Sequence, residues 1–165
     1  MDFSAFFDYP EGNTQENTED FVFLATQSPD DWEKIFSLTG TRRFQTGEVV
    51  IKIGELDRAF HIVTKGTLEV VMPTESPYVL HQIAVIKEGS IFGEQSFFDG
   101  KPRSANVRGV TEGEMLTMSF SSFEVLAARE PELARIILLD LARILSIRLR
   151  QTTTVMMQYI GLTFD

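Results

Sequence analysis

The amino-acid sequence predicts a mainly β fold: an eight-stranded, jelly-roll-like β-barrel with short helices before it and a long helix after it. Between Thr41 and Phe120, apolar residues come in short runs separated by turn signals. A spacing of roughly ten residues between such runs is typical of sandwiches and barrels. On either side of this region, apolar residues recur at helical spacing instead.

The N-terminal part divides into an arm and two expected helices. Residues 1–17 combine aromatic residues with proline, glycine and acids, so we expect an acidic arm that docks on the body or is a disordered tail. A short helix is expected from Thr18. Ser28 has the position of an N-cap for a second helix, because Pro29 and three acidic residues follow it, and Gly40 would end that helix.

The strands are expected within residues 41–120 and the C-terminal helices within about 122–158. The strand candidates are 43–44, 49–51, 59–63, 67–71, 79–85 and 115–120, with the strand end at 91–92 and the extended run from Arg103 in addition. Pro131 suits the first turn of a long helix that reaches at least Gln151. We therefore expect one domain over residues 18–165.

The net charge of −9 is concentrated at the N-terminus. Residues 1–33 hold nine acids and no Lys or Arg, which leaves 15 acids and 15 bases in the rest of the chain. Because binding to nucleic acid requires a basic surface, this distribution argues against a DNA partner.

Composition also limits the compartment and the chemistry. No apolar run reaches the roughly 20 residues of a membrane span, and no secretion signal is seen, so we expect no membrane association. The absence of cysteine fits a cytoplasmic protein. With only His61 and His81 and no glycine-flanked nucleophilic serine, we expect neither a metal site nor an enzyme.

The stretch from Gly89 to Val107 has the residue types of a phosphate and sugar site. Gly93 and Glu94 follow the end of an apolar run and open a possible helical turn, and Arg103 follows the next turn signal. Backbone N–H groups at the start of a helix and an arginine fork both bind anions. A carboxylate can accept hydrogen bonds from ribose hydroxyls.

The run from Phe92 to Val107, FGEQSFFDGKPRSANV, closely resembles the phosphate-binding cassette of cyclic nucleotide-binding domains. These domains sense cAMP or cGMP in protein kinase regulatory subunits, cyclic-nucleotide-gated channels and bacterial Crp/Fnr transcription factors. The resemblance extends upstream through residues 44–54 and 60–66 and covers roughly residues 20–150. It is specific because a carboxylate, an arginine nine residues later and small residues occur together.

The resemblance implies roles for three residues of the cassette. Glu94 would accept a hydrogen bond from the ribose 2′-hydroxyl, and Gly93 would let the backbone approach the sugar. Arg103 would pair with the cyclic phosphate. The alternative is that Glu94 and Arg103 form only a salt bridge within the loop.

Four further residues of the cassette belong to the ligand-binding set that the resemblance implies. Ser96 has the position of a small residue whose backbone N–H meets the phosphate. The Ser104 hydroxyl could bond the phosphate or a syn guanine, and Ala105 follows it. Gln95 departs from the family, which more often has an aliphatic residue there, and we expect this to affect loop packing more than ligand chemistry.

In this family the long C-terminal helix closes over the base, and Arg148 is the candidate for this contact. At 100° per residue, Arg148 falls within the apolar face of the helix, where a charge needs a partner. The resemblance to Crp-type proteins gives a second reason. When residues are counted forward from the cassette without gaps, Arg148 has the position that contacts the base in the C-terminal helix of those proteins. The alternative is a frayed helix with Arg148 in water. Tyr159 is a weaker candidate, as an aromatic lid.

Apolar residues nearly encircle the long helix, so we expect it to contact a second copy or another protein. They are Ile136, Ile137, Leu138, Leu139, Leu141, Ile144, Leu145, Ile147 and Leu149. The simplest arrangement is a homodimer with parallel helices, as in Crp-type proteins.

The expected function is a stand-alone sensor of a cyclic purine nucleotide, with cAMP favoured and cGMP possible, because no effector domain follows the long helix. Binding would draw this helix over the base, and another protein would read the change. The alternative is a degenerate domain that binds no nucleotide and serves as an assembly module. A transcription factor fragment is a third interpretation, and DNA binding would support it.

Overall fold

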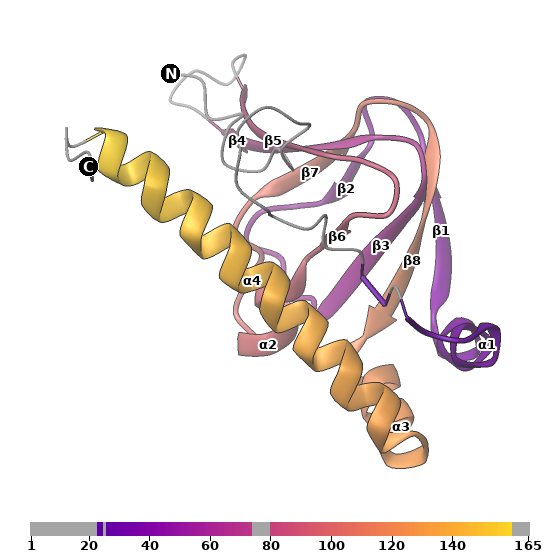
Figure 1. Ribbon diagram of the computed structural model, residues 1–165. Coiled ribbons are helices and arrows are strands. Elements are labelled where there is room, and N and C mark those ends of the chain that lie inside the picture. Colours follow the sequence, from indigo (N-terminus) through magenta and orange to yellow (C-terminus); the bar gives the residue numbers. More distant parts are fainter. Residues whose placement is uncertain (1–22, 25, 74–79, 160–165) are drawn as a thin grey trace.

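The computed structural model describes residues 23–24, 26–73 and 80–159, and it places two β-sheets beside a long C-terminal helix (Figure 1). In chain order the elements are α1 (Pro29–Leu38), β1 (Gly40–Phe44), β2 (Val49–Ile51), β3 (Ala59–Lys65), β4 (Leu68–Pro73), β5 (Leu80–Ile86), β6 (Ile91–Phe92), α2 (Glu94–Asp99), β7 (Asn106–Gly109), β8 (Gly113–Ser119), α3 (Phe120–Arg129) and α4 (Pro131–Tyr159). The arm at residues 1–17 and the start of the helix expected from Thr18 lie outside the described residues.

The eight strands form two antiparallel sheets of four strands each. One sheet has the order β1-β8-β3-β6 and the other the order β2-β7-β4-β5. The strand pairing of the described residues joins them into these two sheets and shows no closed barrel. The mainly β architecture with a long C-terminal helix therefore agrees with the sequence, whereas the closed barrel does not appear.

Strand β3 explains how both faces of the first sheet are covered. Successive side chains of a strand point to opposite faces. Phe60 and Ile62 belong to the apolar cluster shared with the helices, whereas Val63 belongs to the cluster between the two sheets. His61, which has the same parity as Val63, is only 4% exposed. The inward face of β3 therefore carries a buried histidine beside Gly93.

The N-terminal helix α1 begins as the sequence predicts. The Ser28 side chain accepts a hydrogen bond from the Asp31 N–H, and the Asp31 carboxylate accepts one from the Ser28 N–H. This reciprocal capping box satisfies two backbone donors that a helix start leaves unpaired. Ile35 then packs into the cluster between the helices and the first sheet.

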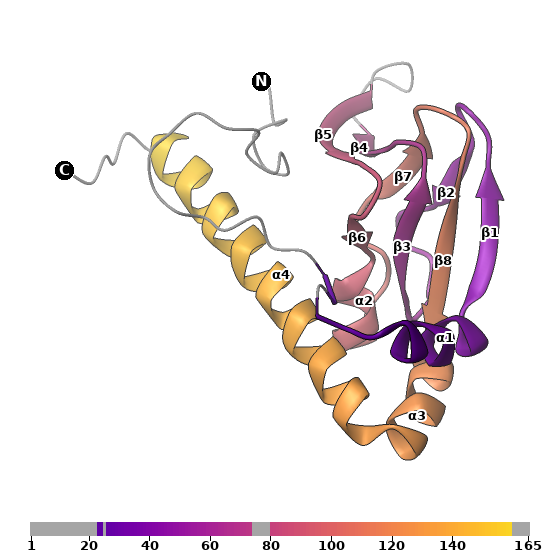
Figure 2. The same ribbon diagram turned by 45° about the vertical axis from the view of Figure 1, so that its right-hand side comes forward.

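Helix α4 packs along α2 and α3 with its first half, and its second half stands away from the sheets (Figure 2). Its buried apolar residues are Leu133, Ala134, Ile137, Leu141 and Ile144. Further along, Leu149 is 68% and Met156 60% exposed. The second half of α4 therefore presents apolar side chains that the described part of the chain does not cover.

A short segment before α1 is held on α4. Phe23 and Leu24 are buried in the same cluster as Ile137 and Leu141. The buried carboxylate of Asp140 accepts a hydrogen bond from the Leu24 N–H at 2.9 Å. Contacts that span 116 residues of sequence thus attach the N-terminal segment to the C-terminal helix.

None of the described helices combines the length and the hydrophobicity that a membrane span requires.

Candidate functional site

The loop at Gly93 connects β6 to the short helix α2 and sets the geometry of the site. Gly93 has φ +81°, a left-handed conformation that side chains disfavour. A Cβ atom there would lie 2.5 Å from Arg103 Nη1 and 2.9 Å from the Ala59 carbonyl oxygen. Only glycine therefore lets the backbone pass this close to the arginine.

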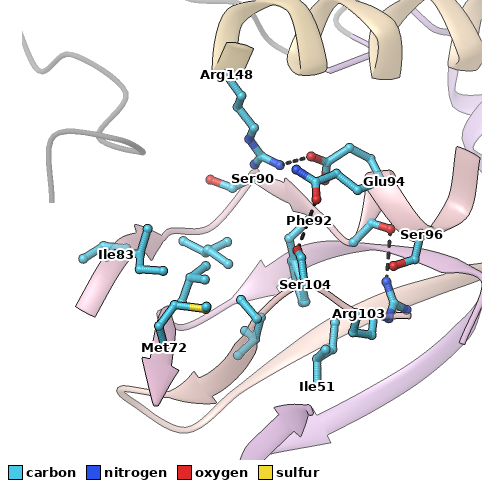
Figure 3. A pocket seen from close by; sticks show the side chains of 17 residues that line it. Ile51, Met72, Ile83, Ser90, Phe92, Glu94, Ser96, Arg103, Ser104 and Arg148 are labelled. Carbon is cyan, nitrogen blue, oxygen red and sulfur yellow. Dashed lines mark hydrogen bonds and ion pairs between the residues drawn. The ribbon is translucent and has the colours of Figure 1, made fainter. Parts of the chain in front are cut away.

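A pocket opens between this loop, the second sheet and α4 (Figure 3). Its lining is mainly apolar on the side of the sheets and polar on the side of α2. The residues are Ile51, Val70, Met72, Ile83, Val85, Ile86, Ser90, Phe92, Gly93, Glu94, Gln95, Ser96, Arg103, Ser104, Ala105, Val107 and Arg148. All eight residues that the sequence singles out as ligand-binding are among them. An apolar pocket with a few convergent polar groups is typical of small-molecule sites.

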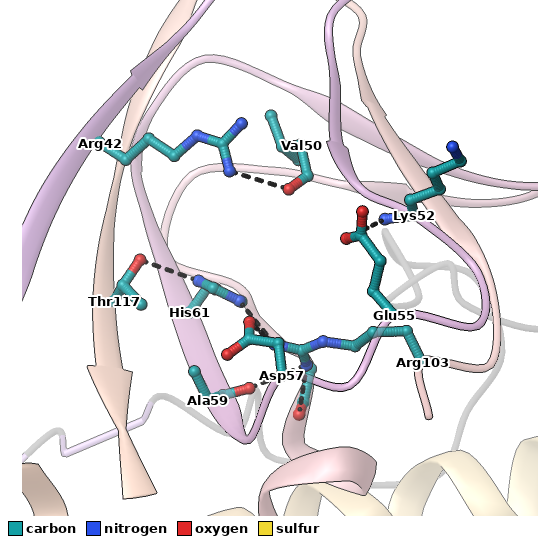
Figure 4. A network of polar contacts seen from close by, with 10 residues as sticks. Arg42, Val50, Lys52, Glu55, Asp57, Ala59, His61, Arg103 and Thr117 are labelled. Carbon is teal, nitrogen blue, oxygen red and sulfur yellow. Dashed lines mark hydrogen bonds and ion pairs between the residues drawn. The ribbon is translucent and has the colours of Figure 1, made fainter. Parts of the chain in front are cut away.

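Arg103 is a buried charge at the polar end of the pocket, with 4% exposure. Figure 4 shows the polar groups around it. Its Nη1 donates to the carbonyl oxygens of Ala59, at 2.9 Å, and Gly93, at 3.0 Å. Its Nη2 contacts the Asp57 carboxylate at 2.6 Å and His61 Nε2 at 3.2 Å. Its Nε is buried and has no hydrogen-bond partner among the described residues. One donor of the guanidinium is therefore left unsatisfied.

His61 is held as a neutral acceptor for Arg103. Because an arginine can only donate, Nε2 of His61 accepts, which leaves the ring proton on Nδ1, 3.0 Å from Thr117 Oγ1. Burial, and then the nearby positive charge of Arg103, lower the pKa of His61 to about 3. The ring also stacks on Phe92, with centroids 4.8 Å apart. His61 therefore supports the arginine.

Glu94 and Arg148 form an ion pair across the mouth of the pocket (Figure 3). Arg148 Nη1 donates to Glu94 Oε1 at 2.5 Å, and Nη2 donates to the Ile91 carbonyl oxygen at 2.6 Å. The side chains are 3% and 17% exposed for Glu94 and Arg148. Because α4 continues to Tyr159, the alternative of a frayed helix with Arg148 in water is wrong.

The remaining cassette residues line the pocket in different ways. Ser96 is buried at 4% exposure, whereas Gln95 and Ser104 are exposed. The Ser104 hydroxyl donates to Gln95 Oε1 at 3.1 Å. Gln95 was expected to affect mainly the packing of the loop. In the structure it makes a polar contact inside the site as well. Ala105 lines the pocket through its small side chain.

The alternative of a salt bridge between Glu94 and Arg103 is not what the structure shows. Each residue pairs with a different opposite charge: Glu94 with Arg148, and Arg103 with Asp57. Sequence reasoning did not identify Asp57 or the role of His61. Asp57 lies in a loop 46 residues from Arg103, and no motif joins the two.

In the described part of the chain, no group of three or more His, Cys, Asp or Glu side chains could hold a metal ion.

Comparison with known families decides the identity of the fold and the cassette. The sequence model of the cyclic nucleotide-binding domain family matches residues 41–130 of this chain. This chain belongs to that family. The matched region contains both sheets and the whole cassette of this cyclic nucleotide-binding domain, but it ends at the start of α4. Arg148 therefore lies outside the match.

Relatives and solved structures agree with this assignment. Over 107 residues the domain is 32% identical to a cAMP-dependent protein kinase regulatory subunit of Emericella nidulans. These residues are 64% of this chain and 25% of the relative. The domain thus spans about a quarter of that relative's length.

Two bacterial crystal structures share the fold. A cyclic nucleotide-binding domain from Methylobacillus flagellatus has a TM-score of 0.74 at 20% identity, covering 86% of this chain and 78% of its own. The Thermus thermophilus catabolite activator protein has a TM-score of 0.71 at 23% identity, covering 81% and 61%. At these identities the likeness concerns the fold alone.

Proposed function

We propose that this domain binds a cyclic purine nucleotide in the pocket at α2 and transmits binding through α4 to a protein partner. The observation that carries the proposal is the position of Glu94 and Arg103, which lie at the polar end of one apolar pocket. The apolar remainder suits a flat base, and the polar end suits a phosphate and a sugar. The similarity to a cAMP-dependent regulatory subunit supports cAMP as the first ligand to test.

The phosphate is proposed to bind at Arg103 and the start of α2. The buried, unpaired Nε–H of Arg103 supplies a donor, and the backbone N–H of Ser96 lies in the first turn of the helix. Gly93 permits close approach of the backbone. These groups match the needs of an anion, since charge-assisted hydrogen bonds are the stronger ones.

The ribose is proposed to bind at Glu94, which now accepts a hydrogen bond from Arg148. A carboxylate has two oxygens and several lone pairs, so Glu94 can accept a 2′-hydroxyl while it keeps its ion pair. Arg148 would then connect ligand, cassette and α4 in one network. Its contact with the base and the role of Tyr159 as a lid stay predictions.

The signal is proposed to leave through α4. Arg148 joins this helix to the pocket, and the exposed apolar residues Leu139, Leu149 and Met156 offer a surface for a second copy or another protein. Ligand binding changes the position of a helix only when one position binds the ligand better. Hydrogen exchange along α4, with and without nucleotide, measures such a change.

Isothermal titration calorimetry with cAMP and cGMP tests the binding proposal. Removal of one partner from a buried charge pair costs about 2–5 kcal/mol, so Arg103→Ala should weaken binding by this amount. Lys101→Ala is the matched control, because Lys101 is an exposed cation of the same loop that does not line the pocket. A loss below about 0.5 kcal/mol for Arg103→Ala would mean that the phosphate binds elsewhere.

The assembly module without nucleotide is the competing function. It is favoured by one observation: four of the five N–H donors of Arg103 already contact protein acceptors, and Glu94 is already paired with Arg148. Absence of heat with either nucleotide at high micromolar concentration would support this function and refute the sensor.

A further inference from the structure

Helix α4 presents a stripe of apolar side chains that continues into its second half, which stands away from the sheets (Figure 2). At 100° per residue, four apolar positions fall within about 40° of one another. These positions are Leu138, Leu145, Leu149 and Met156. The exposed fractions of Leu138, Leu149 and Met156 are 36%, 68% and 60%. A stripe of this kind is the side of a helix that packs on another segment.

Positive charge runs beside this stripe. Arg143 and Arg150 are seven residues apart, so they lie on the same flank of the helix. Residues 141–159 contain one further arginine, Arg148, and no acidic residue. Arg143 keeps 64% of its side chain exposed while it contacts Asp140, and Arg150 is exposed. A segment that combines apolar and acidic side chains would complement this surface.

The chain before α1 is attached to α4 where this surface begins. Asp140 accepts the hydrogen bond from the Leu24 N–H and also contacts Arg143. Leu24 has φ +53°, a left-handed conformation that side chains disfavour, so its contacts hold the backbone there. Six residues separate Leu24 from the arm at residues 1–17. Six extended residues span about 20 Å, the length of about 13 residues of helix, so the arm can reach past Arg150.

The arm has the composition that this surface requires. It contains no Lys or Arg, and its acidic and aromatic residues are Asp2, Asp8, Glu11, Glu16, Phe3, Phe6, Phe7 and Tyr9. Because the arm is attached to α4 through Leu24, the contact is intramolecular, and short linkers give effective concentrations in the millimolar range. A second copy of α4 fits less well, since each copy would bring three arginines and no acid within residues 141–159.

We propose that the arm binds along the second half of α4, with its aromatic side chains on the apolar stripe and its acids beside Arg143 and Arg150. The inference concerns the chain without nucleotide, so it does not depend on the proposed function. A protein partner that uses the same surface of α4 must first displace the arm. The arm is therefore an intramolecular competitor of such a partner.

Paramagnetic relaxation enhancement tests this contact in the full chain. Because the sequence contains no cysteine, Ser4→Cys supplies a single attachment point for a nitroxide spin label. The amide signals of residues 149–156 should broaden with the oxidised label and recover when the label is reduced. Higher salt should diminish the broadening, because it screens exposed charges.

Replacement of the four aromatic residues of the arm by serine should abolish the broadening. It should also raise hydrogen exchange of the amides of residues 149–159 by about 3–10-fold, since a docked segment suppresses local opening of the helix. The matched control keeps every acid and aromatic residue and should leave both measurements unchanged. It consists of Asn13→Ser, Gln15→Ser and Asn17→Ser. Thermal unfolding of each variant shows that the fold is retained.

A mixed sample distinguishes the occupants of the stripe. It combines the spin-labelled chain without isotope enrichment and an unlabelled, isotope-enriched chain. Broadening of residues 149–156 in this sample would mean that the arm of a second copy binds, which overturns the proposal. Dimers in analytical ultracentrifugation without broadening in either sample would assign the stripe to a second α4 and also overturn it. Broadening that persists in the aromatic-to-serine variant would have the same consequence, because proximity alone would then cause it.

Discussion

Replacement of Arg148 by methionine tests whether α4 and the cassette are joined by an ion pair that matters energetically. Methionine keeps most of the aliphatic stem and removes the guanidinium. Glu94, with 3% of its side chain exposed, would lose its countercharge, and the Ile91 carbonyl would lose a donor. Loss of one partner from a buried pair costs about 3–5 kcal/mol. Because Arg148 is 17% exposed and water reaches part of the pair, we expect about 2–3 kcal/mol.

Urea unfolding of a double-mutant cycle measures this cost. In the Glu94→Gln background no carboxylate is left unpaired, so Arg148→Met should cost less than about 1 kcal/mol there. Arg150→Met is the control, since Arg150 is exposed on the same helix, and exposed substitutions usually stay within about 0.5 kcal/mol.

Two results would refute this reasoning. One is a cost for Arg148→Met that equals the cost for Arg150→Met. The other is a cost that does not change in the Glu94→Gln background, because the pair would then contribute nothing beyond the separate side chains.

Three further substitutions test other parts of the structure. Gly93→Ala should destabilise the fold by about 1–2 kcal/mol, since φ is +81°, and should weaken nucleotide binding measured by calorimetry, because its Cβ would displace Arg103. Between pH 7 and 5 the free energy of unfolding should fall by about 2 kcal/mol less in His61→Gln than in the wild type, as measured by urea unfolding at each pH. The unfolded histidine takes up a proton below its ordinary pKa of 6.5, whereas the folded one, with a pKa of about 3, does not. Asp140→Ala should cost about 1–3 kcal/mol in the same assay, because the buried Leu24 N–H loses its acceptor, whereas Asp140→Asn should cost less.

The sequence predicts the local features of the fold well because they depend on neighbouring residues. The Ser28 cap of α1 and the helical turn that Gly93 and Glu94 open are examples. The start of α3 differs from the expectation of about residue 122, since Ser119, Ser121 and Ser122 are all possible caps. The structure selects Ser119, whose side chain accepts from the Ser122 N–H, so α3 begins at Phe120.

The length of α4 shows that the helix propensity of single residues does not by itself determine where a helix ends. Three successive threonines, 152–154, have low helix propensity, although the C-terminal helices are expected to extend to about residue 158. In the structure each threonine hydroxyl donates to the carbonyl oxygen four residues earlier, at 2.9–3.0 Å. These bonds satisfy the hydroxyls inside the helix, which continues to Tyr159.

The partners in the site are harder to predict, because they come from distant parts of the chain. Glu94 and Arg103 follow from the resemblance of the cassette. Asp57 and His61 reach Arg103 from a loop and a strand more than 40 residues away. No spacing rule connects such positions, and a single buried histidine on a strand carries no signal of its contact.

The crowded surroundings of Arg103 have a consequence for ligand affinity. Both Nη atoms already donate to protein acceptors, so a phosphate that approaches these atoms must exchange partners with them. The affinity is then a difference between two sets of hydrogen bonds. Asp57 is the partner that water can most readily replace, because its side chain is 54% exposed. Sensitivity to the ligand can thus be adjusted at Asp57, a residue outside the pocket lining, without altering the cassette.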